Sequence, residues 1–279
     1  MKEGVRFTGG ASTGAFEGCT KLMTFGLSGS ATENVIDLSG VVLDKNESDE
    51  ILTKNTFKGC KFTKVLLPEN FEIAPSMFYN CTALVTVGAT ENVVDLSKAA
   101  GIGASAFYGN TSVVKVVLND AMTELKDSIF SGCTKLANVN LPSKLTSIGQ
   151  SVFYKAPIAG DLILPETLTS LGKDAFNAYS KTNGKLTSVT IPASLQLISN
   201  SAFKYQDKLE KVVILASPII DSYAFDYVKS ATFYLMGETM CKLNNYNAFE
   251  NGVQFVLRAE LFDEYRADAQ WKKLDPFKE

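Results

Sequence analysis

Apolar residues recur along this chain in a repeating frame that begins with a strand-like alternation and ends on a phenylalanine. One copy occupies residues 136–153, and its pattern positions are Leu136, Val139, Leu141, Pro142, Leu145, Ile148, Gly149 and Phe153. The alternation of Val139 and Leu141 predicts a strand. Pro142 should end that strand because proline has no amide hydrogen to donate to a neighbour. Gly149 permits a tight turn, after which Phe153 returns to the interior.

The phenylalanine position recurs ten times, at Phe16, Phe57, Phe78, Phe107, Phe130, Phe153, Phe176, Phe203, Phe225 and Phe249. A period in the low twenties is typical of a leucine-rich-repeat solenoid. One such unit cannot bury its apolar side alone, whereas stacked units share a continuous core. Two spacings are long, and each contains one copy of a near-duplicate segment, at residues 31–39 and 89–97. We expect these segments to replace the usual Leu-Pro turn.

The best copies read AFEGCTKL at residues 15–22, TFKGC at 56–60, MFYNCTAL at 77–84 and IFSGCTKL at 129–136. Together with the Leu-Pro and Ile-Gly steps, this pattern closely resembles the BspA-like leucine-rich repeats, and the resemblance covers roughly residues 11 to 257. It implies a right-handed, β-rich solenoid, here of about ten turns with minor helix content. It also implies a bacterial cell-surface or secreted protein that binds or adheres, with no catalytic residues to carry over.

The chain ends differently from its repeats. Leu261, Tyr265 and Ala269 have helical spacing, so we predict a short helical cap, since the last repeat must cover its open core. The predicted domains are therefore a solenoid over residues 1–257, irregular over 1–56, and a C-terminal cap helix over 258–279.

Four of the five cysteines occupy one position of the frame, three residues after an anchor phenylalanine: Cys19, Cys60, Cys81 and Cys133. Asn110 holds the same position after Phe107. Side chains stacked in one position point the same way, which suits a row of buried structural thiols better than disulfide bonds. We therefore expect all five cysteines, including Cys241 outside the row, to be reduced.

The composition argues against an enzyme. The chain has no histidine, which removes histidine-dependent acid–base catalysis, nucleophilic triads and His-ligated zinc. The G-x-S-x-G match at residues 10–14 is read as a turn, and the G-x-G match at 101–103 as the turn of a repeat. The acidic stretch beginning at Asp44 lacks the glycine and glutamate of a calcium loop. We predict no cofactor and no metal.

Binding is expected on the outward positions of the repeated strands, which should stack into two columns. The candidate partner-binding residues are Leu66, Lys115, Val117, Asn138, Asn140, Asp161, Ile163, Lys211, Val213 and Tyr234. An exposed apolar stripe indicates an interface, although β-branched residues also stabilise strands by cross-strand packing. A second candidate is a row of tyrosines next to the anchors: Tyr79, Tyr108, Tyr154, Tyr205 and Tyr227. These could bind a partner or simply pack over the turns.

The formal net charge of −3 gives no reason to expect nucleic acid as a partner, and no apolar run is long enough to span a membrane. Residues 1–5 do not read as a signal peptide, which by itself would fit a cytoplasmic protein. The resemblance to the BspA-like repeats instead implies an export signal or anchor outside this sequence. The predicted function is a monomeric, non-enzymatic adhesion or binding protein for a host matrix protein, a cell-surface protein or a glycan. The alternative is a spacer that holds another domain away from the cell.

Overall fold

The computed structural model describes residues 16–19, 34–39 and 54–274. The chain is a parallel β-solenoid of about eight turns, where the sequence predicted about ten. It divides into two compact units: residues 1–122 with 128–140, here unit 1, and residues 123–127 with 141–279, here unit 2. The G-x-S-x-G match and the acidic stretch at residues 44–50 lie outside the described residues.

Unit 1 is built on a six-stranded parallel sheet in the order β1-β2-β4-β5-β7-β9. Its strands are β1 (Val35–Asp37), β2 (Lys64–Leu66), β4 (Thr86–Val87), β5 (Val94–Leu96), β7 (Lys115–Leu118) and β9 (Asn138–Val139). Two short strands form a second row, where β3 (Glu72–Ile73) pairs with β6 (Gly101–Ile102).

The near-duplicate segment at residues 89–97 adds a strand to unit 1. Val94 of β5 pairs with Val87 of β4 on one side and with Val116 of β7 on the other. In the second row, β3 pairs with β6 with no strand between them. The expectation of a replaced Leu-Pro turn did not include this strand, which carries its own alternating Val94 and Leu96, both buried.

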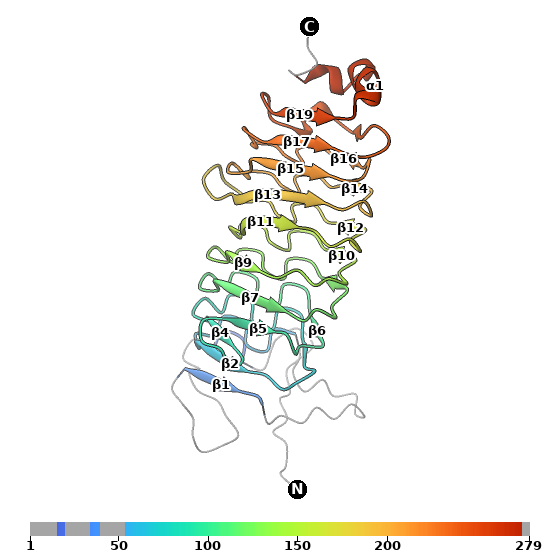
Figure 1. Cartoon of the computed structure of the whole chain (residues 1–279). Helices are drawn as coiled ribbons and strands as arrows, with labels where there is room; N and C mark the ends of the chain where they lie inside the picture. Colours follow the sequence, from blue (N-terminus) through green and yellow to red (C-terminus); the bar gives the residue numbers. More distant parts are fainter. Residues whose placement is uncertain (1–15, 20–33, 40–53, 275–279) are drawn as a thin grey trace. The chain divides into compact units, whose positions relative to one another are not determined.

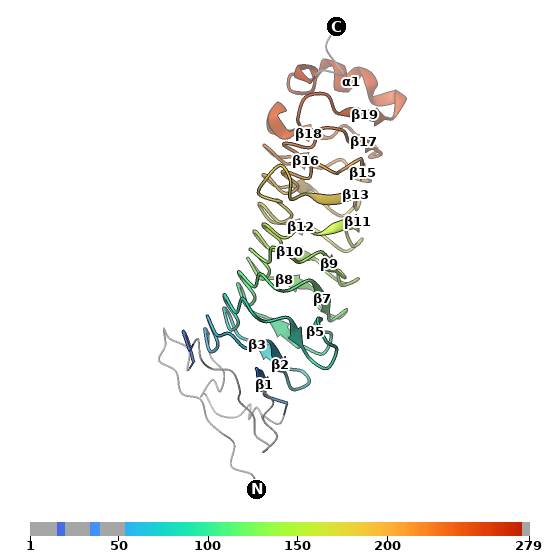
Figure 2. The same ribbon diagram turned by 90° about the vertical axis from the view of Figure 1, so that its left-hand side faces the viewer.

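Unit 2 has a five-stranded parallel sheet in the order β11-β13-β15-β17-β19. Its strands are β11 (Ala159–Ile163), β13 (Lys185–Ile191), β15 (Lys211–Ile214), β17 (Thr232–Leu235) and β19 (Gln254–Leu257), stacked in order in Figure 1. Short strands form two further rows: β8 (Glu124–Leu125), β10 (Ser147–Ile148) and β12 (Ser170–Leu171), then β14 (Leu197–Ile198), β16 (Ile219–Ile220) and β18 (Lys242–Leu243). Figure 2 shows these rows on the side of unit 2 away from the five-stranded sheet.

The anchor phenylalanines form a stack inside each unit. In unit 1 the rings of Phe57 and Phe78 are 5.8 Å apart and 4° from parallel. In unit 2 the rings of Phe176 and Phe203 are 5.5 Å apart and 2° from parallel. The anchors from Phe57 onward are all buried, which makes each ring a nearest-neighbour contact between successive turns.

The cysteine position forms a row of hydrogen bonds beside the rings of unit 1. The thiols of Cys60, Cys81 and Cys133 donate to the carbonyl oxygens of Phe16, Phe57 and Phe107 over 3.2, 3.0 and 3.2 Å. Burial raises the pKa of Cys60 to about 11 and that of Cys133 to about 12. All five cysteines are free thiols.

Cys19 differs from the expected row of buried thiols because its side chain is exposed. It lies in the first described turn, and among the described residues it has a neighbouring turn on one side only, that of Cys60.

The predicted helical cap is present, although it is divided. The 3₁₀ turn η2 (Ala259–Leu261) leads into α1 (Phe262–Ala267), and η3 (Trp271–Lys273) follows. A further 3₁₀ turn, η1 (Tyr246–Ala248), precedes β19. Trp271 is fully buried against Phe249 and Phe255, and its indole nitrogen donates to the Cys241 carbonyl over 2.7 Å. The cap thus covers the last ring of the unit 2 stack, and the boundary at residue 258 stays a prediction.

Candidate binding faces

The outer face of the five-stranded sheet in unit 2 carries a continuous column of five outward side chains. The strand register places Ile163 beside Thr190, Thr190 beside Val213, Val213 beside Tyr234 and Tyr234 beside Val256. Alternate residues of these strands are buried, so the five face away from the core. Ile163 is 70 % exposed and Val256 is 45 % exposed. The column is therefore open to solvent and largely apolar.

A neighbouring apolar column lies one step further along the strands, and the sequence analysis did not include it. Leu215 and Met236 follow the ends of β15 and β17, and their amides continue the ladder by donating to Ile191 and Ile214. Both side chains are exposed. In earlier turns Pro165 and Pro192 hold this position. Because proline ends a strand, the sequence pattern predicted that the strand stops at this position. It therefore did not indicate that the later turns place apolar side chains on the outer face there.

The polar column on the same face is partly committed to internal contacts. Asp161 accepts hydrogen bonds from Ser188 Oγ and Thr187 Oγ1 over 2.7 and 2.9 Å, and these bonds lower the pKa of its carboxyl group. The Lys211 ammonium lies 5.5 Å from the centre of the Tyr234 ring. Asp161 therefore ties β11 to β13, whereas Lys211 stays exposed above the apolar column.

Unit 1 does not bring its five candidate residues into one stripe. Leu66 lies on β2 and Val117 on β7, and the strands β4 and β5 separate them. Asp95 of β5 is the register partner of Val117, so a carboxylate interrupts the apolar column. Thr86 of β4, the register partner of Lys64, holds an outward position of the repeated strands but does not contribute to the outer face. Thr86 is fully buried, since its hydroxyl accepts a bond from the Asn92 amide in the added segment.

The remaining unit 1 candidates are exposed but polar. Lys115 and Asn138 are opposite one another across β7 and β9. The side-chain amide of Asn140 accepts from the Leu118 nitrogen over 2.8 Å and donates to the Leu118 oxygen over 3.2 Å. The side chain of Asn140 thus continues the hydrogen-bond ladder beyond the end of β9, so this residue stabilises the sheet.

A hollow of about 310 Å³ opens in unit 1 beside the added strand. Its walls include Leu66, Phe71, Val87, Asp95 and Leu96, and Glu69 and Lys98 form an ion pair at its lining. The volume is at the lower end of the range for ligand pockets. Among the described residues no group of histidine, cysteine or acidic side chains could hold a metal ion.

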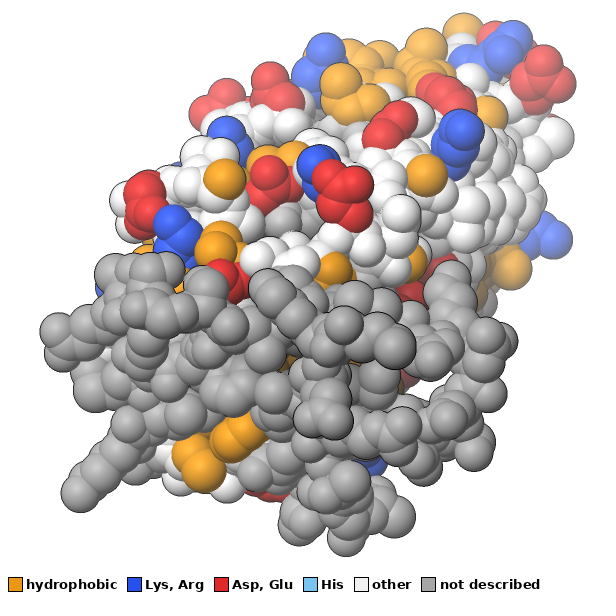
Figure 3. Space-filling view, turned by 90° about the horizontal axis from the view of Figure 1, so that it is seen from below, with side chains coloured by type: hydrophobic (Ala, Val, Ile, Leu, Met, Phe, Trp, Pro, Cys, Tyr) orange, Lys and Arg blue, Asp and Glu red, His pale blue; other side chains and the backbone are white. Residues whose placement is uncertain are grey.

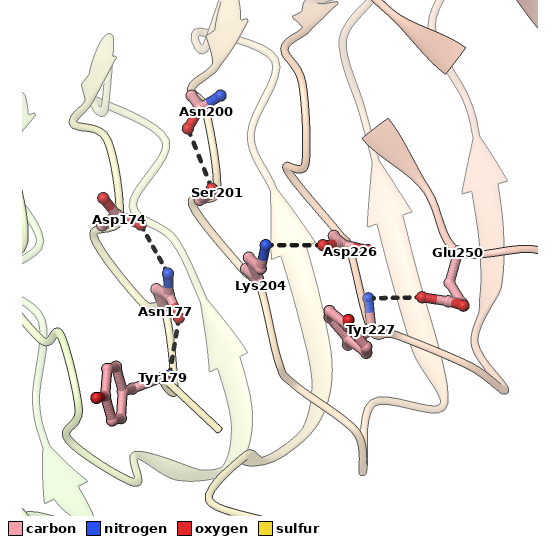
Figure 4. Close-up of polar contacts among 9 residues, drawn as sticks. All are labelled: Asp174, Asn177, Tyr179, Asn200, Ser201, Lys204, Asp226, Tyr227 and Glu250. Atoms are coloured by element: carbon pink, nitrogen blue, oxygen red, sulfur yellow. Dashed lines mark hydrogen bonds and ion pairs between the residues drawn. The ribbon is translucent and has the colours of Figure 1, made fainter. Parts of the chain in front are cut away.

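The tyrosine row is most developed in unit 2, where it alternates with lysines. The rings of Tyr205 and Tyr227 stack 4.6 Å apart. The Lys204 ammonium lies 5.1 Å from the Tyr205 ring and 4.8 Å from the Tyr223 ring, and it pairs with Asp226 over 2.8 Å. Burial works to lower the pKa of Lys204, but its bond to the Asp226 carboxylate raises it overall. Figure 4 shows the ion pair between Lys204 and Asp226, with Tyr227 nearby.

In unit 1 the row is shorter. Tyr79 and Tyr108 stack with ring centres 4.5 Å apart, and the Lys58 ammonium lies 5.4 Å from the Tyr79 ring. The sequence analysis missed Tyr179 and Tyr223, which join the row in unit 2 although their offset from the anchor phenylalanine differs.

Charges of both signs are interspersed on the described surface. Figure 3 shows lysine, arginine and acidic side chains mixed over the visible face, without a broad region of one sign. None of the described helices has the length and hydrophobicity needed to cross a bilayer.

The repeated strands and stacked phenylalanines define a leucine-rich-repeat protein. A family model described as "BspA type Leucine rich repeat region" matches residues 50–101 and 100–232, with six copies. Because this match covers more than half of the chain, the protein belongs to the BspA-type leucine-rich-repeat family.

The comparison with solved structures finds other leucine-rich-repeat proteins. One from T. pallidum is 25 % identical with a TM-score of 0.48, covering 66 % of this chain and 77 % of the other. One from Bacteroides ovatus is 19 % identical with a TM-score of 0.43, covering 80 % and 82 %. A leucine-rich cell-surface protein from Faecalibacterium prausnitzii is 15 % identical with a TM-score of 0.38, covering 83 % and 90 %. A search among curated proteins gives no significant match.

Proposed function

We propose that this protein is a non-enzymatic adhesin of the bacterial surface that binds another protein through the outer face of the five-stranded sheet in unit 2. Candidate partners are host matrix proteins and proteins of other cell surfaces. Family membership supports a repeat-based surface protein. The choice of face rests on the exposed apolar column from Ile163 to Val256.

The outer face of the unit 2 sheet is uncovered, as in other solenoids, and solenoids bind partners along such repeated surfaces. In unit 2 the inner face covers the core, while the outer face leaves Ile163, Leu215, Met236 and Val256 between 38 % and 70 % exposed. Contiguous exposed apolar surface marks interfaces. The mixed polar column beside it, with Lys211, would supply the polar rim that interfaces carry.

The test introduces charge at the two most exposed positions of the column. Purified Ile163→Asp/Val256→Asp protein is compared with the unaltered protein for saturable binding to immobilised matrix proteins and for attachment to host cells. A matched control, Leu197→Asp/Ile219→Asp, places the same charges on the short-strand row of unit 2, where both residues are about 40 % exposed. Circular dichroism checks that all variants fold.

We expect the sheet-face variant to lose binding and the control to keep it. If the unaltered protein binds nothing in the panel, or if both variants bind as well as it does, the adhesin proposal fails. The spacer function would then explain the chain better.

A further inference from the structure

We propose that the tyrosine–lysine edge of unit 2 is a second binding surface, which takes an anionic polysaccharide carrying carboxylate or sulfate groups. This edge consists of Tyr154, Lys155, Tyr179, Lys181, Lys204, Tyr205, Tyr223 and Tyr227. It follows the anchor phenylalanines and is separate from the strand positions of the sheet face, so the inference does not rest on the adhesin proposal.

The first observation is that large side chains occupy backbone positions that favour glycine. The second residue after the anchor phenylalanine is left-handed in eight of the ten turns, and in unit 1 it is Gly18, Gly59, Asn80, Gly109 or Gly132. In unit 2 the same position holds Lys155, Tyr205 and Tyr227, with φ of 65°, 65° and 62°. A bulky residue in this conformation costs free energy that glycine avoids.

Two further tyrosines on this edge have the same unfavourable backbone conformation. In the described turns before that of Phe225, the residue two positions before the anchor phenylalanine is also left-handed, and it is asparagine, serine or aspartate. In the Phe225 turn this position is held by Tyr223, with φ of 60°. Tyr179, with φ of 71°, begins a stretch that lengthens the anchor spacing from 23 to 27 residues before Phe203. Strained residues gathered in one place indicate a functional surface.

The second observation is an excess of unused hydrogen-bond donors. The Lys155 ammonium lies 3.6 Å from the Tyr179 ring centre, and the Lys181 ammonium lies 4.6 Å from the Tyr227 ring centre. Neither lysine makes an ion pair within the described part of the chain. A cation resting on a ring keeps its N–H groups available, so each lysine can still donate to a ligand.

The acidic groups on the same edge are already occupied by neighbouring donors. Asp226 pairs with Lys204, Asp174 accepts from Asn177 over 2.7 Å, and Glu250 accepts from the Tyr227 amide over 3.2 Å. These contacts are drawn in Figure 4. Asp226 is neutralised by Lys204, whereas Asp174 and Glu250 bond to uncharged amides and keep their charge. Lys155 and Lys181 are therefore the groups of this edge that would pair with the negative charges of a ligand.

The shape of the edge favours a polysaccharide over an acidic peptide. Successive turns are about 4.8 Å apart, so the surface from the Phe153 turn to the Phe225 turn is roughly 15 Å long and suits an extended chain. Tyrosine hydroxyls both donate and accept, which matches the hydroxyl groups of sugars. Tyr179 and Tyr223 are 51 % and 42 % exposed and offer aromatic surface for the apolar faces of sugar rings.

The test measures binding of the whole protein to polygalacturonate, which carries carboxylates, and to dextran sulfate. Uncharged dextran and polyglutamate serve as comparison ligands. We expect saturable binding to at least one of the two anionic polysaccharides, weakening with added salt because charges are screened. The one that binds more tightly identifies the anionic group. No binding to either, or equal binding to uncharged dextran or polyglutamate, would overturn the proposal.

Variants then locate the site. Lys155→Gln/Lys181→Gln should weaken polysaccharide binding at least tenfold. The control Lys144→Gln/Lys272→Gln removes the same charge from exposed positions elsewhere in unit 2 and should leave the affinity within twofold. Equal losses in both variants would mean that only net charge matters, and the site would be rejected.

A tyrosine variant separates binding from folding. Tyr205→Gly relieves the left-handed strain, as glycine does at the same position in unit 1, so the protein should still fold while polysaccharide binding falls at least fivefold. Undiminished binding by folded Tyr205→Gly protein would count against the aromatic part of the site. The sheet-face variant Ile163→Asp/Val256→Asp should bind polysaccharide normally, so this proposal and the adhesin proposal can fail independently.

Discussion

Asn110 is an imperfection in the core of unit 1, and replacing it with cysteine should stabilise the protein. Its side chain is fully buried, and neither its amide nitrogen nor its amide oxygen has a hydrogen-bond partner. The turns before and after it hold Cys81 and Cys133 at the same position, and each thiol donates to the phenylalanine carbonyl one turn earlier. In Asn110→Cys the new thiol should reach the Phe78 carbonyl in the same way.

The expected gain follows from the penalty for burying polar groups without partners. An unsatisfied buried donor or acceptor costs about 1–3 kcal/mol. Cysteine is close to asparagine in volume and leaves no large cavity, so most of that penalty should be recovered. We therefore expect Asn110→Cys to raise the free energy of unfolding by about 1–3 kcal/mol.

Gln206 provides a matched control with the opposite sign. It is a buried polar residue at the same position in unit 2, but its longer side chain donates to the Phe176 carbonyl over 2.7 Å and accepts from the Leu186 amide. Shortening it in Gln206→Asn should break both bonds and destabilise unit 2 by about 1–3 kcal/mol.

Urea unfolding in reducing buffer measures both variants, and hydrogen exchange locates each change. Because repeats couple to their neighbours, the added protection in Asn110→Cys should centre on the turns that contain Phe78 and Phe130. A lower unfolding midpoint for Asn110→Cys would refute the reasoning, since it would mean that the Asn110 amide is satisfied in the folded protein.

Two further predictions concern the stacked rings and the thiols. Phe130→Ala should lower the free energy of unfolding by about 3–5 kcal/mol, with exchange rising mainly in adjacent turns; uniform loosening along the chain would contradict nearest-neighbour coupling. Iodoacetamide at pH 8 should modify Cys19 in the folded protein and spare Cys133, which is buried with its pKa raised to about 12; mass spectrometry after digestion would reveal rapid Cys133 labelling if this is wrong. The same raised pKa predicts that the stability contributed by Cys133 is full below about pH 9 and falls as the pH rises toward 12, because only the thiol of the unfolded protein ionises in that range. The urea midpoint should therefore change less between pH 8 and pH 10 in Cys133→Ala than in the unaltered protein.

The repeated core could be predicted from the sequence because the same pattern of core residues occurs in each turn. Each unit has a phenylalanine at a fixed distance from a strand with alternating apolar residues, and this arrangement allows one way of stacking the units. Ten copies of the phenylalanine position are too many to arise by chance. The added strand β5 escaped prediction for the same reason. It has the alternation of a strand, but no anchor phenylalanine lies between it and β4, so the sequence pattern indicated only a replacement of the Leu-Pro turn.

The candidate surfaces were harder to predict because their geometry depends on neighbours in space. The apolar column of unit 2 followed directly from strand register. In unit 1 the same rule misplaced Thr86, because the inserted segment covers it. The contact between Lys181 and Tyr227 joins residues 46 positions apart, and no periodic pattern indicates it.

Residues that depart from the repeat pattern are therefore the most informative about the function of this protein. A residue that matches the frame is explained by the fold, since any turn needs it to continue the stack. Tyr205 and Tyr227 are not explained in that way, because glycine serves the same backbone position in unit 1 with less strain. Leu215 and Met236 are likewise unnecessary to the core, since their side chains lie on the solvent side of the sheet. These departures gather on two surfaces of unit 2, which is what selection for two binding surfaces on one repeated scaffold would produce.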